Sequence, residues 1–131
     1  MFIDASAIVA VLAKEPERAL FREKIESARS VLMSSLTIYE ATLGLARITR
    51  NNLVASRATM RDFISISQAR IVPVDVEIGE MAVDAFDRFG KGRHHAGLNM
   101  GDCFSYACAK AHRVPLLFKG DDFVHTDITP A

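Results

Sequence analysis

The sequence predicts an α/β fold in a single domain over residues 1–131, with a short parallel sheet covered by helices on both faces. Short apolar runs alternate with segments of helical periodicity along the whole chain. This alternation is typical of βαβ units, which build parallel sheets. The chain has no repeats, low-complexity segments or linker, and 131 residues is the size of one domain.

The short apolar runs are interpreted as strands and the longer periodic segments as helices. We expect strands at residues 2–3, 31–33, 71–74 and 115–118. We expect helices at residues 6–12, 16–28, 37–50, 54–69, 76–89 and 101–112.

Capping residues and helix breakers set the expected ends of several helices. Ser6 is a suitable N-cap for the first helix, and Pro16 is a favoured first residue for the second. Asp75 is a suitable cap for the fifth helix, which carries one apolar stripe and stops at Gly90. The first strand runs directly into Asp4, so a carboxylate stands where a central strand should end.

The charge balance gives no global attraction to nucleic acid or to a membrane surface. Sixteen basic residues balance sixteen acidic ones, so any attraction must be local. No apolar run approaches the roughly 18 residues that span a bilayer, and we expect a soluble protein with no membrane partner. Cys103 and Cys108 lie about 140° apart around a helix. We interpret them as core residues in the reducing cytoplasm.

Four acidic residues share one relation to the predicted sheet. Asp4 ends the first strand, and Glu40 falls in the first turn of the helix after the second strand. Asp102 begins the helix before the last strand, and Asp121 follows that strand. Active sites of α/β proteins lie at the carboxyl ends of the strands, so we expect all four along one edge of the sheet.

Each acidic residue also has an ordinary structural explanation. Asp102 or Asp121 alone is more often a cap or turn residue, and Glu40 suits a helix N-terminus. Asp4 is different, because Ser6 already offers the cap and a buried unpaired carboxylate is costly.

Convergent carboxylates without a lysine or arginine between them repel one another, and a cation relieves that repulsion. A site made of oxygen donors suits magnesium or manganese rather than zinc. Such a site favours phosphoryl chemistry, in which the metal activates water and stabilises the leaving oxygen. A P-loop and a Gly-x-Gly-x-x-Gly motif are both absent.

These residues carry a resemblance that spans nearly the whole chain. Phe2–Ala7, Glu40, Gly101–Ala107 and Leu116–Phe123 occur in the order seen in the PIN-domain family. The chain resembles, more closely, the VapC toxins of bacterial type II toxin-antitoxin pairs. The resemblance implies a magnesium- or manganese-dependent endoribonuclease, a homodimer, and inhibition by a VapB antitoxin.

The resemblance also implies roles for individual residues. Asp4, Glu40 and Asp102 match the family's acidic trio, and Ser6 matches its accompanying hydroxyl. Asp4 and Asp102 are expected to hold the metal, with Ser6 in support. Glu40 and a fourth acid are expected to orient or deprotonate the attacking water.

The fourth acid has two candidates. Asp121 and Asp122 both fit the closing motif. We prefer Asp121 as the catalytic residue and place Asp122 in support, because the pair Asp122-Phe123 more often anchors a turn.

Basic side chains are candidates for contacts to RNA phosphates, which position a substrate without reading its sequence. These are Arg88, Lys91, Arg93 and Lys119. Two other classes of function remain open: a metal-dependent phosphatase or DNA nuclease, and a catalytically inactive PIN-like binding module.

Overall fold

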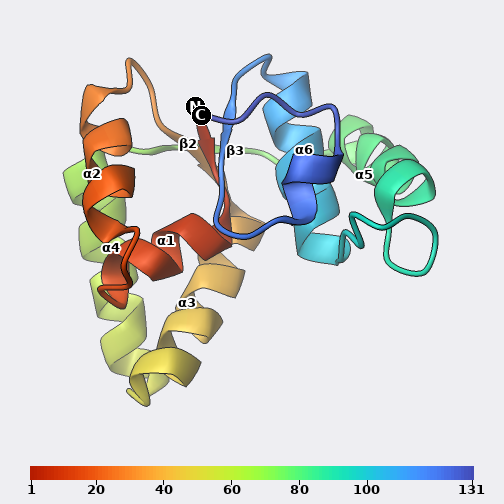
Figure 1. The fold of residues 1–131 in the computed structure, drawn as a ribbon. Helices are drawn as coiled ribbons and strands as arrows, with labels where there is room; N and C mark the ends of the chain where they lie inside the picture. The colour runs from red at the N-terminus through yellow and green to blue at the C-terminus, as the bar shows by residue number, and fades with distance from the viewer.

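The computed structural model describes residues 1–131 and confirms the predicted α/β architecture (Figure 1). Four parallel strands form one sheet in the order β3-β2-β1-β4. The strands are β1 (Phe2–Ile3), β2 (Leu32–Ser34), β3 (Arg70–Val72) and β4 (Leu116–Leu117).

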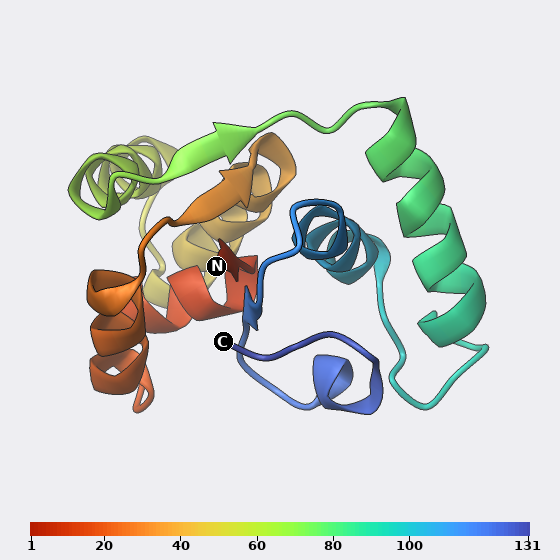
Figure 2. The ribbon, with the colours of Figure 1, turned by 90° about the horizontal axis from the view of Figure 1, so that it is seen from above.

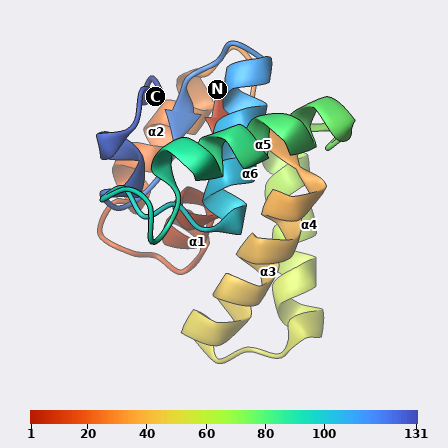
Figure 3. The ribbon, with the colours of Figure 1, turned by 90° about the vertical axis from the view of Figure 1, so that its right-hand side faces the viewer.

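All six expected helices are present, and a 3₁₀ helix follows β4. The helices are α1 (Ala5–Leu12), α2 (Arg18–Ser27), α3 (Ser35–Thr49), α4 (Leu53–Ser67), α5 (Val76–Phe89), α6 (Met100–Ala111) and the 3₁₀ helix η1 (Asp122–His125). Helices α3 and α4 lie side by side and extend beyond the sheet (Figure 3).

Two helix starts differ from the expectation for local reasons. The α2 helix begins two residues after Pro16, because the N–H of Arg18 bonds the carbonyl of Glu15 and closes a turn first. The α3 helix begins earlier than expected, because Ser34 caps it in a reciprocal capping box with Thr37. Glu40 therefore lies in the second turn of its helix and not in the first.

The sheet separates two apolar cores, because successive residues of a strand point to opposite faces. Phe2 and Leu116 pack on one face with α5 and α6. Ile3 and Leu117 pack on the other face with α1, α2 and α4 (Figure 2). The cysteines Cys103 and Cys108 are buried, unbonded members of the first core, as expected.

The C-terminal segment covers the β4 edge of the sheet. The N–H of Leu116 donates to the carbonyl of Thr129, and the N–H of Ala131 donates back to the carbonyl of Leu116, both at 2.9 Å. Asp127 holds the same segment to α6 by accepting a hydrogen bond from the Tyr106 hydroxyl at 2.5 Å. These bonds fix η1, which lies between β4 and Asp127. None of the helices has the length and hydropathy to cross a membrane.

Candidate active site

Asp4 is buried at the carboxyl end of β1, where its side chain caps α1. The residue is 4% exposed. Its Oδ2 accepts from the backbone N–H of Ser6 at 2.8 Å and from the Ser6 hydroxyl at 2.6 Å. The prediction that Ser6 caps this helix was wrong, because the helix already begins at Ala5 and Asp4 is its N-cap. Oδ1 of Asp4 accepts no hydrogen bond from the protein and is the oxygen free for a ligand.

Ser6 connects Asp4 to the end of β4. Its hydroxyl donates to the carboxylate of Asp4 and accepts the backbone N–H of Lys119 at 3.0 Å. This chain of bonds fixes the orientation of the buried carboxylate. The supporting side chain Ser6 therefore acts on the carboxylate of Asp4.

Glu40 is half-buried in α3, and its carboxylate rests against Gly101 at the start of α6. A Cβ at residue 101 would overlap both carboxylate oxygens, so only a glycine leaves room for this approach. Burial, together with the charges of Asp4 and Asp102, raises the pKa of Glu40 to about 7. Glu40 can therefore hold or release a proton near neutral pH.

Asp102 occupies the first turn of α6, in a reciprocal capping box with Asn99. The backbone N–H of Asn99 donates to Oδ2 of Asp102 at 2.9 Å, and the N–H of Asp102 donates to Oδ1 of Asn99 at 3.0 Å. Burial raises the pKa of Asp102, and the hydrogen bond from Asn99 opposes this rise. With the charges of Asp4 and Asp122, which also raise it, the pKa is about 6. The capping box thus orients a carboxyl that its surroundings disfavour as an anion.

The structure brings Asp4, Glu40 and Asp102 into one electrostatic group. Neither a lysine nor an arginine is among the groups that shift the pKa of Glu40 or Asp102. The protein supplies oxygen donors and uncompensated negative charge, which fits a hard divalent cation in ligand chemistry and in charge. The side chains do not converge into a ready metal cluster in this structure.

The two candidates for the fourth acid, Asp121 and Asp122, differ in their effect on the pKa of Asp102. Asp121 and Asp122 are both exposed at the start of η1, after a turn at Gly120 with a φ of 97°. The charge of Asp122 raises the pKa of Asp102, whereas that of Asp121 is not among the causes. The preference for Asp121 as the fourth acid stays a prediction, and Asp122 is the one of the two whose charge acts on Asp102.

Lys119 directs its ammonium away from the acidic group. Its Nζ lies 2.6 Å from Oε2 of Glu15 and 3.0 Å from Oε2 of Glu17, both in the turn between α1 and α2. These bonds raise the pKa of Lys119. Its backbone, through Ser6, is the part that supports the site.

The remaining candidate cations lie on or near the turn after α5. Arg88 pairs with Asp127 at 3.3 Å, and Arg93 pairs with Asp87 at 2.7 Å. The side chains of both pairs are about half exposed or more, so solvent screens them and they contribute little to stability. Lys91 is exposed and has no ion pair.

Two residues that shape the site were not singled out by the sequence. Gly101 was noted as part of a helix start and of the family motif but not for its size, although its missing side chain admits the Glu40 carboxylate. Asn99 caps α6 and orients Asp102. The spacing from Asn99 to Asp102 matches a capping box and was the available signal.

Comparisons with known proteins agree over the whole chain. The family model described as PIN domain matches residues 1–128. The VapC ribonuclease Mb0640 of Mycobacterium bovis is 41% identical over 128 residues, which cover 98% of this chain and 95% of that protein. The VapC ribonuclease R02377 of Rhizobium meliloti is 37% identical over an alignment of 139 residues. The alignment covers 97% of this chain and 98% of that protein.

One solved structure shows the same fold at low sequence identity. It is the crystal structure of Mycobacterium tuberculosis VapC20, described as a sarcin-ricin loop cleaving toxin. The match has a TM-score of 0.79 at 16% identity and covers 99% of this chain and 97% of that chain.

Proposed function

The chain belongs to the PIN-domain family, among the VapC ribonucleases, and we propose that it is the metal-dependent endoribonuclease toxin of a VapBC-type pair. The observation that carries the proposal is the group of Asp4, Glu40 and Asp102, whose charges act on one another with no compensating cation. Carboxylates that repel one another in this way favour the binding of a cation.

Asp4 and Asp102 would hold Mg²⁺ or Mn²⁺, Asp4 through its free Oδ1. The bound cation would supply charge for the phosphate and make water more acidic. Ser6 holds Asp4 in place, and the Asn99 capping box holds Asp102. Both carboxylates are thus held by bonds that need no substrate.

Glu40 would accept the proton of the attacking water. A general base is most effective when its pKa is near the working pH, and burial has raised that of Glu40 to about 7. We further propose Asp122 as the fourth acid in place of Asp121, because only Asp122 acts on Asp102.

The test is cleavage of single-stranded RNA by aspartate-to-asparagine variants. Asp4→Asn and Asp102→Asn should each lower kcat by at least about 100-fold with unchanged circular dichroism, and EDTA should abolish cleavage reversibly. Asp84→Asn, on the exposed face of α5, is the matched control and should match the parent. Retained magnesium-dependent cleavage in Asp102→Asn would contradict the assignment.

The same assay separates the remaining alternatives. Asp122→Asn should lower the rate more than Asp121→Asn. Duplex DNA and a chromogenic phosphate should be poor substrates if the enzyme is a ribonuclease. A parent protein inert toward all three substrates would favour a binding module.

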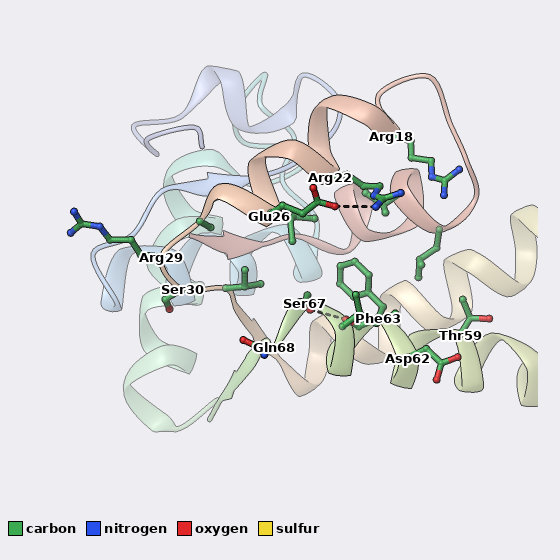
Figure 4. Close-up of a pocket in the computed structure, with 16 residues that line it drawn as sticks. Arg18, Arg22, Glu26, Arg29, Ser30, Thr59, Asp62, Phe63, Ser67 and Gln68 are labelled. Carbon is green, nitrogen blue, oxygen red and sulfur yellow. Dashed lines mark hydrogen bonds and ion pairs between the residues drawn. The ribbon is translucent and has the colours of Figure 1, made fainter.

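A groove between α2 and α4 is the proposed binding site for a segment of the VapB antitoxin (Figure 4). It encloses about 660 Å³. Ile25 and Phe63 give it an apolar floor, and its rim carries Arg22, paired to Glu26 at 3.0 Å. An apolar floor with a charged rim suits an amphipathic segment that folds on binding. A basic residue beyond that segment would then reach the acidic group.

A second copy of the chain is proposed to cover α5 and α6. Val83, Phe86 and Met100 are 63%, 40% and 65% exposed, and they line a second, apolar groove of about 220 Å³. Contiguous exposed apolar surface of this kind marks an interaction site. Action on cellular RNA would place the protein in the cytoplasm.

A further inference from the structure

Three histidine rings form a continuous row between η1 and the turn at residues 91–97. The ring centroids of His94 and His95 are 4.1 Å apart at an interplanar angle of 35°. Those of His95 and His125 are 4.5 Å apart at 59°. Phe89 closes the buried end, edge-on to His94 at 5.4 Å. His95 and His125 are exposed, so the row begins in the core and ends in solvent.

The inner end of this histidine row is held in place by the backbone. Nδ1 of His94 accepts the N–H of Ala96 at 3.1 Å. The N–H groups of Arg93 and His94 both donate to the carbonyl of Gly90 at 3.0 Å, which closes the turn. A ring that is already ordered loses little conformational entropy when a ligand stacks on the row.

The outer end of the row is connected to the acidic group through η1. His125 is the last residue of η1 and Asp122 is the first, so one 3₁₀ turn separates them. The charge of Asp122 acts on Asp102. Figure 2 shows η1 and the turn at residues 91–97 on the same side of the molecule, next to α6. A nucleotide at the acidic group would have its neighbour within reach of the row.

The chemistry of the rings favours stacking over the other uses of a histidine cluster. Partial desolvation by the adjacent rings, together with the charges of His94 and His125, lowers the pKa of His95, which favours the neutral ring and makes it a poor phosphate ligand. The three rings pack against one another at tilted angles and do not form a metal site. Neutral aromatic faces are where RNA-binding proteins stack unpaired bases.

We propose that His94, His95 and His125 form a stacking platform for an unpaired base of the RNA substrate, next to the nucleotide that is cleaved. This inference rests on the proposed ribonuclease function and adds a base-binding site to it. His125 is the outermost ring and offers the face away from His95. Lys91, exposed and unpaired on the same turn, is placed to meet a flanking phosphate.

The experiment measures binding by fluorescence anisotropy in magnesium, in an Asp4→Asn background that cannot cleave. The probes are a labelled single-stranded RNA of about ten nucleotides and an abasic ribose-phosphate chain of the same length. His95→Ala and His125→Ala should raise the Kd for the RNA by about fivefold or more, and His125→Phe, which keeps a ring, should not. None should change the Kd for the abasic chain. His112→Ala, a histidine outside the row, is the control.

Kinetics in the active protein supply a second readout. His125→Ala should raise KM and leave kcat within about twofold, because stacking acts on substrate binding. An equal loss of affinity for both probes would mean that the row only supports the fold, and the inference would be wrong. Unchanged binding in both alanine variants would also overturn it while leaving the ribonuclease function intact. A parent that neither binds nor cleaves RNA would refute both proposals.

Discussion

At the scale of single residues, the raised pKa of Glu40 has a consequence for stability. With its pKa at about 7 in the folded protein, against 4.5 in a free carboxyl, Glu40 binds more protons folded than unfolded between these values. The free energy of unfolding of the metal-free protein should therefore fall as pH rises from about 4.5 to about 7. Asp102, with a pKa of about 6 against 3.8, acts in the same direction at lower pH.

Glu40→Gln should remove the part of this pH dependence that Glu40 contributes and leave the part that comes from Asp102. In EDTA at pH 8 we expect the variant to melt about 3 °C or more above the parent, as expected for roughly 1 kcal/mol in a chain of this size. At pH 4.5 the two melting temperatures should converge. Thermal melts monitored by circular dichroism across pH 4–9 measure this. A constant offset at every pH would mean that the effect is not electrostatic.

Gly101 provides a second prediction at this scale. In Gly101→Ala the new methyl group would displace the Glu40 carboxylate, which ends a flexible side chain and can move. We expect a folded protein of near-parent melting temperature whose kcat falls about tenfold or more, because the proposed base, Glu40, would have left its position.

Gly79→Ala is the matched control for this substitution. Gly79 is also helical, and a Cβ there meets no atom within 4 Å. It should keep full activity and gain slightly in stability. Equal activity in the two alanine variants would contradict the role given to Gly101.

At the scale of elements, a substitution in the groove between α2 and α4 should weaken antitoxin binding without changing RNA cleavage. Ile66 on α4 lines the groove and is 83% exposed. Ile66→Glu should weaken antitoxin binding by at least about tenfold, because a carboxylate would be buried against an apolar segment, and should leave RNA cleavage by the free protein unchanged. Val54→Glu, on the same helix, 79% exposed and outside the groove, is the control. Calorimetric titration with the purified antitoxin measures both. An undiminished affinity in Ile66→Glu would place the antitoxin elsewhere.

At the scale of the whole molecule, a bound cation should stabilise the fold through linkage. Magnesium at about ten times its Kd adds about 1.4 kcal/mol if it binds only the native state. The parent and Asp84→Asn should show this increase in melting temperature, and Asp102→Asn should show less of it. The metal-free Asp102→Asn protein should melt at or above the parent, since one repelling charge is gone. A clearly less stable variant would mean that Asp102 serves chiefly in the capping box.

The sequence predicted the architecture because apolar periodicity encodes burial, and both faces of this sheet are buried. It predicted the ends of elements less well, since neighbouring groups compete within one turn. Asp4, and not Ser6, is the N-cap of α1. Ser34 is the N-cap of α3, so the helix begins earlier than expected and Glu40 lies in its second turn. The choice between Asp121 and Asp122 depends on the orientation of a single 3₁₀ turn, which periodicity does not describe.

The order of the acidic residues along the chain has a practical consequence. The exposed loop at residues 50–52, where α3 passes into α4 (Figure 3), divides the sequence into two parts. Asp4 and Glu40 belong to the first, and Asp102 and Asp122 belong to the second. A gene interrupted at this loop would encode two fragments, neither with a complete set of carboxylates. Each fragment could be produced in a living cell without harm, and mixing them would switch the enzyme on as a split reporter.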